Sequence, residues 1–253
     1  MKATQSVSIL LPFLLLSSAA YSGPEVDRLL EGYSKIEAVS CHIRRTKEGN
    51  LGKMTFLSRV YWTNKDQLHA EGISPIKRRT IADGKTLWQH IEGDSKGFSR
   101  PVDELSEPMT ISLRMVPGTA MDHLLRLKGF DETPLAGDAT AAKQVGIQAG
   151  EQYVVLRFDA ADRLIGLRFF KTSGMKELTA RYDYSGFAEA APGAWVPLAH
   201  ELVVFGGDGS FNETVRVDRF VANKPVAESL FISSSFFDKS VDFVFDFANI
   251  SNK

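Results

Sequence analysis

A Gly84-Lys85-Thr86 triplet is the first group of residues whose types could do chemistry, because it matches the end of a phosphate-binding loop. Such a loop also needs a glycine five positions before the glycine of the triplet. Arg79 stands at that position. The triplet is therefore predicted to form the tight turn of a β-hairpin, and not to bind a nucleotide.

Nucleophilic and metal chemistry have no visible support either. Cys41 is the only cysteine, and the adjacent His42 would point to the opposite face of a strand, so we expect Cys41 to be a small buried thiol. The histidines are never two or four residues apart, the spacings that bring two ligands to one face. They are His42, His69, His90, His123 and His200. We predict no catalytic residue, no metal site and no cofactor, and expect that the protein is not an enzyme.

The overall composition is that of a globular chain. The 253 residues are 43% hydrophobic and 24% charged, and 30 basic against 31 acidic residues leave a formal net charge of −1. Nucleic-acid binding needs a basic surface, which this balance makes improbable. We therefore expect no nucleic-acid partner.

The N-terminal residues have the pattern of a secretory signal peptide. Lys2 is followed by an apolar run from Val7 to Leu16 and by small residues that end at Ser22. That run is too short to span a bilayer as an anchor. We predict that residues 1–22 are cleaved, that residues 23–253 form a single domain, and that the protein works in the periplasm, where a lone cysteine is common.

The remaining chain predicts an α+β domain. Residues 24–40 have apolar side chains at helical spacing, whereas strand patterns with a period of two follow from Cys41 to residue 100. Helical spacing returns between Glu104 and Leu127, with a break at Pro117-Gly118, and strand patterns resume from residue 151 to 221. We predict an unclosed, strongly curved antiparallel β half-barrel of about ten to twelve strands, covered by helices.

Several strands carry apolar and aromatic residues on both faces, for example Tyr61 and Trp62, or Phe169 and Phe170. A single-layer sheet cannot bury both faces unless other elements cover one of them. Helices that plug a solid core would satisfy this pattern, and so would helices that roof a cavity. Met109, Met115 and Met121 in the helical insertion favour a surface that adapts to an apolar guest, although methionine also suits irregular cores.

A family resemblance rests on the order of these elements and on one moderately specific motif. The matching segments run from Met54 through Trp62, Leu68-x-Ala70-Glu71, Ile81 to Trp88 with its Asp83-Gly84-Lys85-Thr86-Leu87-Trp88 hairpin, Phe158-Asp159 to Arg163-Leu164, and Asn223-Lys224-Pro225-Val226 to Leu230-Phe231. Over most of residues 24–231 the chain resembles LolA-like outer-membrane lipoprotein carriers and lipoprotein-sorting proteins.

The resemblance implies a carrier that shields acyl chains in a hydrophobic cavity while they cross water between membranes. The implied cavity residues are Met54, Phe56, Val60, Trp62, Leu87, Met121, Leu124 and Leu125. The carrier's lid arginine is missing here, and His69 is the candidate for the lid tether. The implied partners are lipoprotein acyl chains or free lipid, and inner- or outer-membrane proteins that load and receive the cargo; the protein is expected to be a monomer.

Two other functions are compatible with the same sequence. A lipid-sensing or envelope-stress module that binds a membrane protein would explain the missing lid arginine and the C-terminal extension, residues 236–253. In that extension Phe243, Phe245 and Phe247 alternate with other residues and predict one more strand. A small-molecule enzyme on the same fold is the third hypothesis, and titratable groups gathered inside the cavity would favour it.

Overall fold

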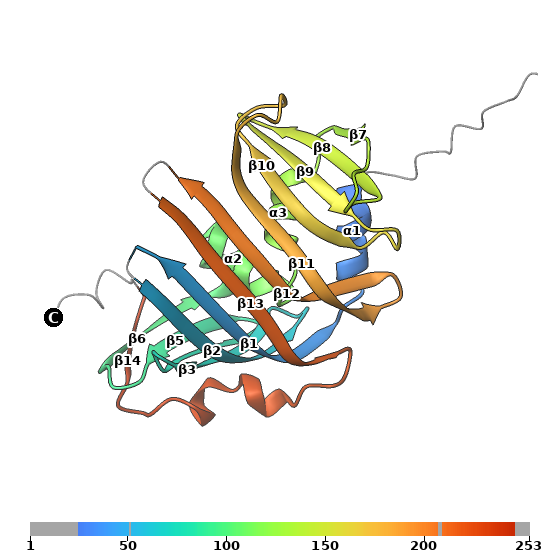
Figure 1. The fold of residues 1–253 in the computed structure, drawn as a ribbon. Coiled ribbons are helices and arrows are strands. Elements are labelled where there is room, and N and C mark those ends of the chain that lie inside the picture. Colours follow the sequence, from blue (N-terminus) through green and yellow to red (C-terminus); the bar gives the residue numbers. More distant parts are fainter. Residues whose placement is uncertain (1–24, 51, 207–208, 246–253) are drawn as a thin grey trace, which may run out of the picture.

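A computed structural model describes residues 25–50, 52–206 and 209–245 of the protein. Its strands form one 14-stranded sheet in the order β14-β6-β5-β4-β3-β2-β1-β13-β12-β11-β10-β9-β8-β7. All neighbouring pairs are antiparallel except β14 with β6 (Figure 1). The predicted signal peptide, residues 1–22, lies outside the described residues.

Apart from β14, the strands fall into two groups, which α2 and α3 separate along the chain. The first group is β1 (Ala38–Gly49), β2 (Gly52–Thr63), β3 (Gln67–Ser74), β4 (Arg78–Asp83), β5 (Thr86–Ile91) and β6 (Lys96–Pro101). The second group is β7 (Glu132–Leu135), β8 (Lys143–Ala149), β9 (Gln152–Phe158), β10 (Leu164–Phe170), β11 (Leu178–Ala191), β12 (Ala194–Gly206) and β13 (Gly209–Ala222). Pairing of β1 with β13 joins the two groups into a continuous sheet.

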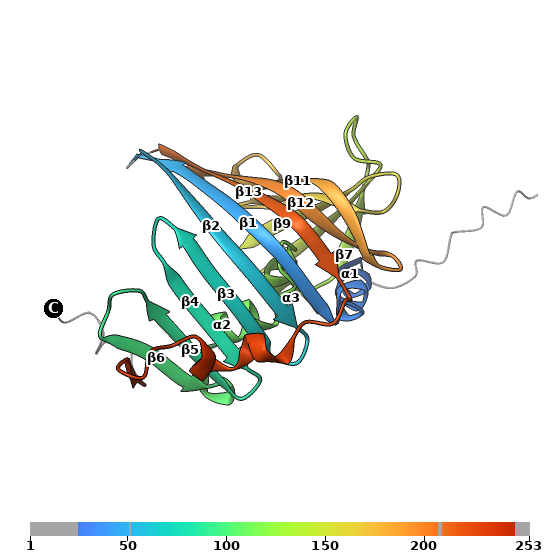
Figure 2. The ribbon, with the colours of Figure 1, turned by 90° about the horizontal axis from the view of Figure 1, so that it is seen from below.

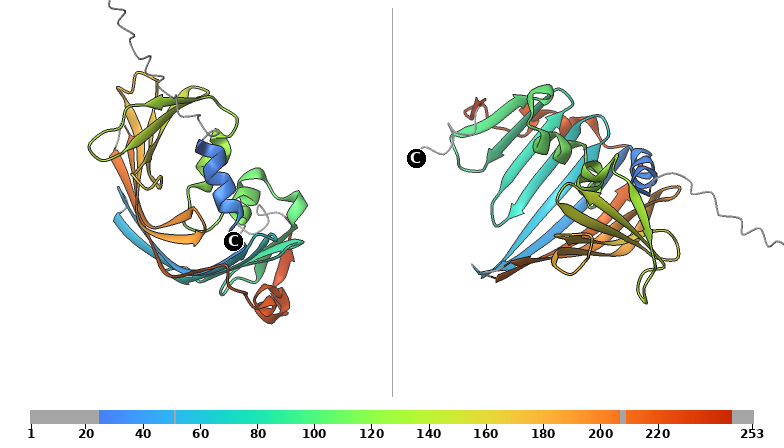
Figure 3. Two further views of the ribbon diagram at one scale, coloured as in Figure 1. Left: turned by 90° about the vertical axis from the view of Figure 1, so that its right-hand side faces the viewer. Right: turned by 90° about the horizontal axis from the view of Figure 1, so that it is seen from above.

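The helices lie inside the curve of this sheet, and its far edges do not meet (Figure 3). They are α1 (Glu25–Ser34), α2 (Glu107–Arg114) and α3 (Met121–Leu127), with a short 3-10 turn, η1 (Val102–Glu104), before α2. Within the part of the chain that the structure describes, no helix has the length and apolar character needed to cross a membrane. The predicted unclosed half-barrel covered by helices is confirmed.

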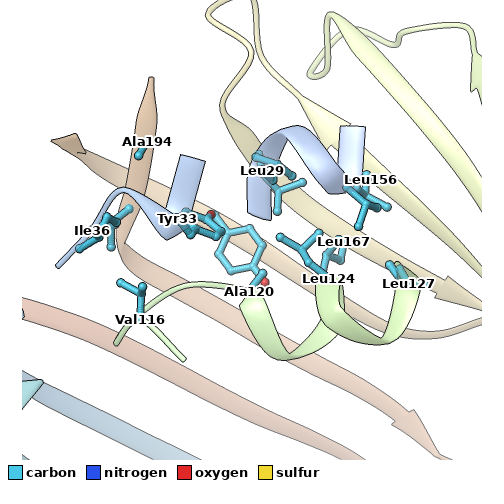
Figure 4. Close-up of a cluster of buried hydrophobic side chains, with 14 of the residues drawn as sticks. Leu29, Tyr33, Ile36, Val116, Ala120, Leu124, Leu127, Leu156, Leu167 and Ala194 are labelled. Carbon is cyan, nitrogen blue, oxygen red and sulfur yellow. The ribbon is translucent and has the colours of Figure 1, made fainter. Parts of the chain in front are cut away.

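A large apolar core fills the space between α1, α3 and the second group of strands. On α1 the side chains of Val26, Leu29 and Tyr33 recur at helical spacing and are buried. Leu124 of α3 is fully buried against them (Figure 4). A smaller cluster forms under α2 and consists of Ala82, Leu87, Phe98, Val102 and Leu113. The two helix-covered regions therefore have separate cores.

The C-terminal segment crosses the outer, convex face of β3 to β6 (Figure 2). It contains two 3-10 turns, η2 (Glu228–Phe231) and η3 (Ser233–Ser235), and ends in β14 (Asp242–Val244), which runs parallel to β6. Arg79 of β4 donates to the Phe236 carbonyl at 3.1 Å and lies over the ring of the same residue. β14 is shorter than the alternation of Phe243, Phe245 and Phe247 predicts, and Phe247 lies outside the described residues.

Element boundaries differ from the predictions in two places. The first helix ends at Ser34 and β1 already begins at Ala38, whereas the apolar spacing predicted a helix up to residue 40. Val39 and Cys41 are buried on one face of β1, so their spacing fits a strand as well as a helix. The sheet also has more strands than the ten to twelve predicted, because short segments such as β7 and β14 carry too few residues to produce a visible alternation.

Candidate functional site

Three hollows lie in a row along the concave face of the sheet, beside and beneath the helices. We call them the mouth hollow (about 380 Å³), the middle hollow (about 270 Å³) and the far hollow (about 500 Å³). The mouth and middle hollows share Ile43, Arg45, Val60 and Ala70 in their walls, and the middle and far hollows share His123 and Tyr182. Together they form the concave groove.

The mouth hollow has an apolar floor and a cationic margin. Its walls are Ile43, Arg45, Lys47, Phe56, Leu57, Ser58, Val60, Ala70, Gly72, Ser74, Ile76, Arg78, Thr80 and Ile91. The alternation of β1 sends Ile43, Arg45 and Lys47 to the same face. Three of the wall residues are cationic, and among the described residues that line the hollow none is acidic.

The middle hollow lies under α2, α3 and the segment that joins them. Trp62 of β2 is buried, and its indole Nε1 donates to the Leu113 carbonyl of α2 at 2.7 Å. Arg114, the last residue of α2, donates from Nε and Nη2 to the Asp66 carboxylate at 2.9 and 3.0 Å. These two contacts join the helical roof to the sheet on the concave side.

Gly118 brings the connection between α2 and α3 close to the sheet. Its φ is +88°, a backbone conformation that favours glycine, and a Cβ there would lie 3.3 Å from a methyl group of Val217 and 3.4 Å from the Pro197 carbonyl. Thr119 stabilises the same turn by donating to the Val116 carbonyl at 2.8 Å. The roof is thus fixed at this connection.

A cluster of polar side chains lies in the middle of the groove. Glu213 is only 8% exposed, and its carboxylate forms ion pairs with Arg45 at 3.3 Å and with Lys47 at 3.4 Å. Burial lowers the pKa of His200 to about 4 and also lowers the pKa of His123. Both histidines are therefore neutral at neutral pH. The groove is apolar but not free of titratable groups.

The far hollow is bordered by aromatic and aliphatic side chains. Phe169 and Tyr182 pack edge to face with ring centroids 6.0 Å apart, and His123 lies 4.8 Å from the Tyr182 ring. Burial raises the pKa of Tyr182 to about 12, so its hydroxyl keeps its proton. Phe130 and Val204, at the rim, are 43% and 36% exposed. The groove thus continues as apolar surface past α3.

Only some of the predicted cavity residues line the groove. Val60 and Trp62 do, and Phe56 is in the wall of the mouth hollow. Met54 is 51% exposed beyond the hollows, and Leu87 belongs to the small cluster under α2. The residues of α3 have other positions: Leu124 fills the main core, Met121 packs against it, and Leu125 is half-buried.

The structure corrects the prediction for His69. Leu68 faces the groove, so the next residue, His69, faces the outer side of β3. There its Nδ1 donates to the Leu230 carbonyl at 2.8 Å, and its ring lies 4.5 Å from that of Phe236. His69 therefore holds the C-terminal segment, and it cannot reach the helical roof across the sheet.

Sequence reasoning missed the charged residues of the groove. Arg45, Lys47 and Glu213 were not among the candidates, although Arg45 and Lys47 follow Val39, Cys41 and Ile43 at a strict spacing of two. That spacing was the available signal for the cations. Glu213 comes to Arg45 only through the pairing of β1 with β13, which the sequence pattern does not specify.

A fourth hollow, of about 580 Å³, lies on the outer face between β2 to β5 and the C-terminal segment. Charged groups that pair with one another dominate it. Glu71 accepts from Arg79 at 2.6 Å and lies 3.7 Å from Arg59. This polar hollow does not suit an apolar guest. Within the described ranges, no three His, Cys, Asp or Glu side chains are grouped so that they could hold a metal ion.

Solved structures share this architecture over nearly the whole chain. A LolA superfamily protein from Nitrosomonas europaea is 13% identical with a TM-score of 0.52, and the match covers 85% of this chain and 100% of that one. A DUF1329 family protein from Desulfovibrio piger is 9% identical with a TM-score of 0.53, covering 84% and 98% of the two chains. The chain has a LolA-like fold.

A third solved structure shares the architecture. It is a domain from Vibrio parahaemolyticus assigned to the outer membrane lipoprotein-sorting proteins, 9% identical with a TM-score of 0.50, and the match covers 83% of this chain and 98% of that one. No protein-family model and no curated protein matches the sequence. The predicted LolA-like architecture is confirmed, and at these identities the similarity is one of fold.

Proposed function

We propose that the protein is a periplasmic carrier that binds the acyl chains of a lipoprotein or of another lipid in the concave groove and moves them between membranes. The observation that carries this proposal is the row of hollows along the concave face, with an apolar floor of side chains such as Ile43, Val60 and Ala70. The mouth hollow and the far hollow, at about 380 and 500 Å³, are each in the range of known ligand pockets, about 300–1,000 Å³.

The energetics of lipid transfer explain why such a groove is needed. Burying a methylene group is worth about 0.8 kcal/mol, so an acyl chain of about sixteen carbons resists transfer into water by on the order of 10 kcal/mol. A protein that replaces the water around the chain removes this barrier. The groove has to be apolar and adaptable, and it also has to release its cargo.

The construction of the roof supports release. Leu113 is the only residue of α2 that is buried, and a helix of eight residues has little stability of its own. Two contacts, from Trp62 and from Arg114, hold it to the sheet on the concave side. Opening the roof would break these polar contacts and lift one buried side chain, Leu113, out of the small apolar cluster, whereas α3 is fixed by the main core.

The LolA-like fold and the N-terminal sequence support the cellular setting. The similar structures include a LolA superfamily protein and a domain assigned to lipoprotein sorting. Residues 1–22 have the sequence of a cleavable signal peptide, which would export a single domain formed by residues 23–253 to the periplasm. Loading and receiving proteins in the inner and outer membranes complete the proposed route.

Native mass spectrometry of the protein purified from its own periplasm, followed by lipid extraction, tests the proposal. We expect one acylated molecule per protein. Ser58→Phe should abolish the complex, because Ser58 lines the mouth hollow and a phenylalanine would fill it. Ser40→Phe is the matched control, since Ser40 is also half-buried but lies on the opposite face of the neighbouring strand. Protein without lipid, or equal occupancy in both variants, would contradict the proposal.

A second candidate function is an enzyme that acts on a small molecule in the same groove. The observation in its favour is the cluster of Glu213, His123 and His200, which places a carboxylate and two neutral imidazoles beside the middle hollow. Glu213 is already paired with two cations, which makes it a poor base. Chemical change of an added lipid during incubation, lost in His200→Gln, would favour the enzyme over the carrier.

A further inference from the structure

The mouth of the concave groove differs in charge from its deeper part. On β1 the inward-facing residues change along the strand from Cys41 and Ile43 to Arg45 and Lys47. The apolar residues lie toward the roof, and the cations lie toward the hairpin that joins β1 to β2. The wall of the groove formed by β1 therefore changes from apolar under the roof to basic at the mouth.

The basic end is not neutralised by its surroundings. Glu213 is the carboxylate that pairs with both Arg45 and Lys47, so one negative charge faces two positive charges. Arg78 of β4 adds a third cation to the same hollow, and it forms no ion pair with any described residue. Its guanidinium faces the side-chain amide of Gln89, which it approaches to 3.1 Å. An excess of positive charge thus surrounds an apolar floor.

The position of these cations is suited to binding an anion. The side chains of Arg45 and Lys47 are 49% and 43% exposed. Both can therefore turn toward a ligand without a rearrangement of the core. Arginine and lysine form charge-assisted hydrogen bonds with phosphate and carboxylate, and apolar surroundings strengthen them. Phe56, Ile76 and Ile91 supply such surroundings at the same hollow.

We propose that the groove selects a lipid with an anionic headgroup, which binds at Arg45, Lys47 and Arg78 while its acyl chain extends along Val60 and Ala70 toward Trp62. This inference rests on the proposed function and names its ligand class. The occupant is one amphiphilic molecule. A free phosphate or carboxylate ion would leave the apolar floor uncovered, and a neutral lipid would leave the cations unpaired.

Two lysophospholipids with the same 14-carbon chain test the selection: lysophosphatidylglycerol, which is anionic, and lysophosphatidylcholine, which is zwitterionic. Binding is measured below their micelle concentrations by isothermal titration calorimetry. We expect about tenfold tighter binding of the anionic lipid, the effect of one charge-assisted hydrogen bond. High salt should weaken only this preference. Equal affinities would overturn the inference and leave the carrier proposal standing, whereas absence of binding by either lipid would overturn both.

Charge variants locate the headgroup. Arg45→Gln and Arg78→Gln should each reduce the affinity for lysophosphatidylglycerol several-fold and leave that for lysophosphatidylcholine unchanged. Arg44→Gln is the matched control, because it removes the same charge from the adjacent residue, whose side chain faces the outer side of β1. Glu213→Gln should increase the affinity several-fold, since it frees Arg45 and Lys47. An equal loss in Arg44→Gln and Arg45→Gln, or no change in any variant, would contradict this placement.

Discussion

The two helices that cover the concave groove, α2 and α3, are held in different ways. α3 contributes Leu124 and Leu127 to the main core, where both are almost fully buried and pack with α1. α2 fully buries Leu113 alone, with the partly buried Met109 packed against the same small cluster, and its polar anchors are the Trp62 indole and the ion pair of Arg114 with Asp66. One helix is thus part of the structural core, and the other is a weakly attached cover.

We propose that this difference would let α2 move while the main core keeps the half-barrel stable. Apolar burial accounts for most of the stability of a domain and is lost only when the core comes apart. A few hydrogen bonds and an exposed ion pair contribute on the order of 1 kcal/mol each and can break locally. The protein therefore separates the helix that stabilises the sheet from the helix that we propose to move.

Leu124→Ala tests the structural side of the comparison and should have the largest effect. Leu124 is fully buried in the main core, so its truncation should lower the free energy of unfolding by about 3 kcal/mol. Urea unfolding followed by circular dichroism measures the change. Leu125 of the same helix is only half-buried, so Leu125→Ala should lower the free energy of unfolding by well under half as much as Leu124→Ala. Equal losses would show that α3 is not anchored through Leu124.

The pH dependence of stability tests the polar cluster of the middle hollow, which lies under both helices. His200 is partly buried near Tyr182, Tyr184, Glu213, Arg45, Asp122 and His123. Its pKa is about 4 in the folded protein and 6.5 in an unfolded chain, so the unfolded state binds more protons below pH 6.5. Stability should fall by about 2 kcal/mol as the pH drops from about 6.5 to 4, and then level off.

Urea unfolding at pH 7 and at pH 4.5 measures this loss. The His200→Gln variant should lose clearly less stability than the wild type over the same interval, because the glutamine takes up no proton. His123, whose pKa is also lowered by burial, accounts for part of what remains. If both proteins lose the same amount, His200 does not titrate as its burial implies.

Trp62→Phe tests the cover side of the comparison and should have the smallest effect on global stability. It removes the hydrogen bond to the Leu113 carbonyl, at a cost of about 1 kcal/mol. The amide protons of α2 should then exchange with solvent about tenfold faster, while those of α3 are unaffected. Trp88→Phe, a half-buried tryptophan on the outer face of β5, is the control. Amide exchange in α2 that is equally fast in Trp62→Phe and in the wild type would contradict the weak attachment of this helix.

Much of the architecture could be predicted from the sequence because the strands alternate strictly. The strand patterns expected from Cys41 to residue 100 correspond to β1 to β6, which begin at Ala38 and end at Pro101, and the hairpin turn expected at Gly84 lies between β4 and β5. The break between α2 and α3 was marked by Pro117 and Gly118. Strand alternation and turns are determined by residues close together in the chain, so a single sequence is enough to predict them.

The site was harder to predict because it depends on which face of a strand each side chain occupies and on which distant strands pair. A shift of one residue moves a side chain to the other face of a strand, which is why His69 contacts the C-terminal segment while Leu68 faces the groove. Glu213 and Arg45 are distant in sequence and meet only because β13 pairs with β1. Leu124 has the apolar spacing of a cavity residue, yet it is part of the core.

The parallel pairing of β14 with β6 has a consequence for how copies of the protein behave at high concentration. The free edge of a long sheet is a template on which another chain can add as a further strand, and this is the first step of fibre growth. Here Phe243 lies against Gly97, where even a Cβ atom would collide with the ring, and Val244 pairs with Phe98. The C-terminal segment thus occupies the edge of β6 along Lys96 to Phe98, so another chain cannot add to β6 there.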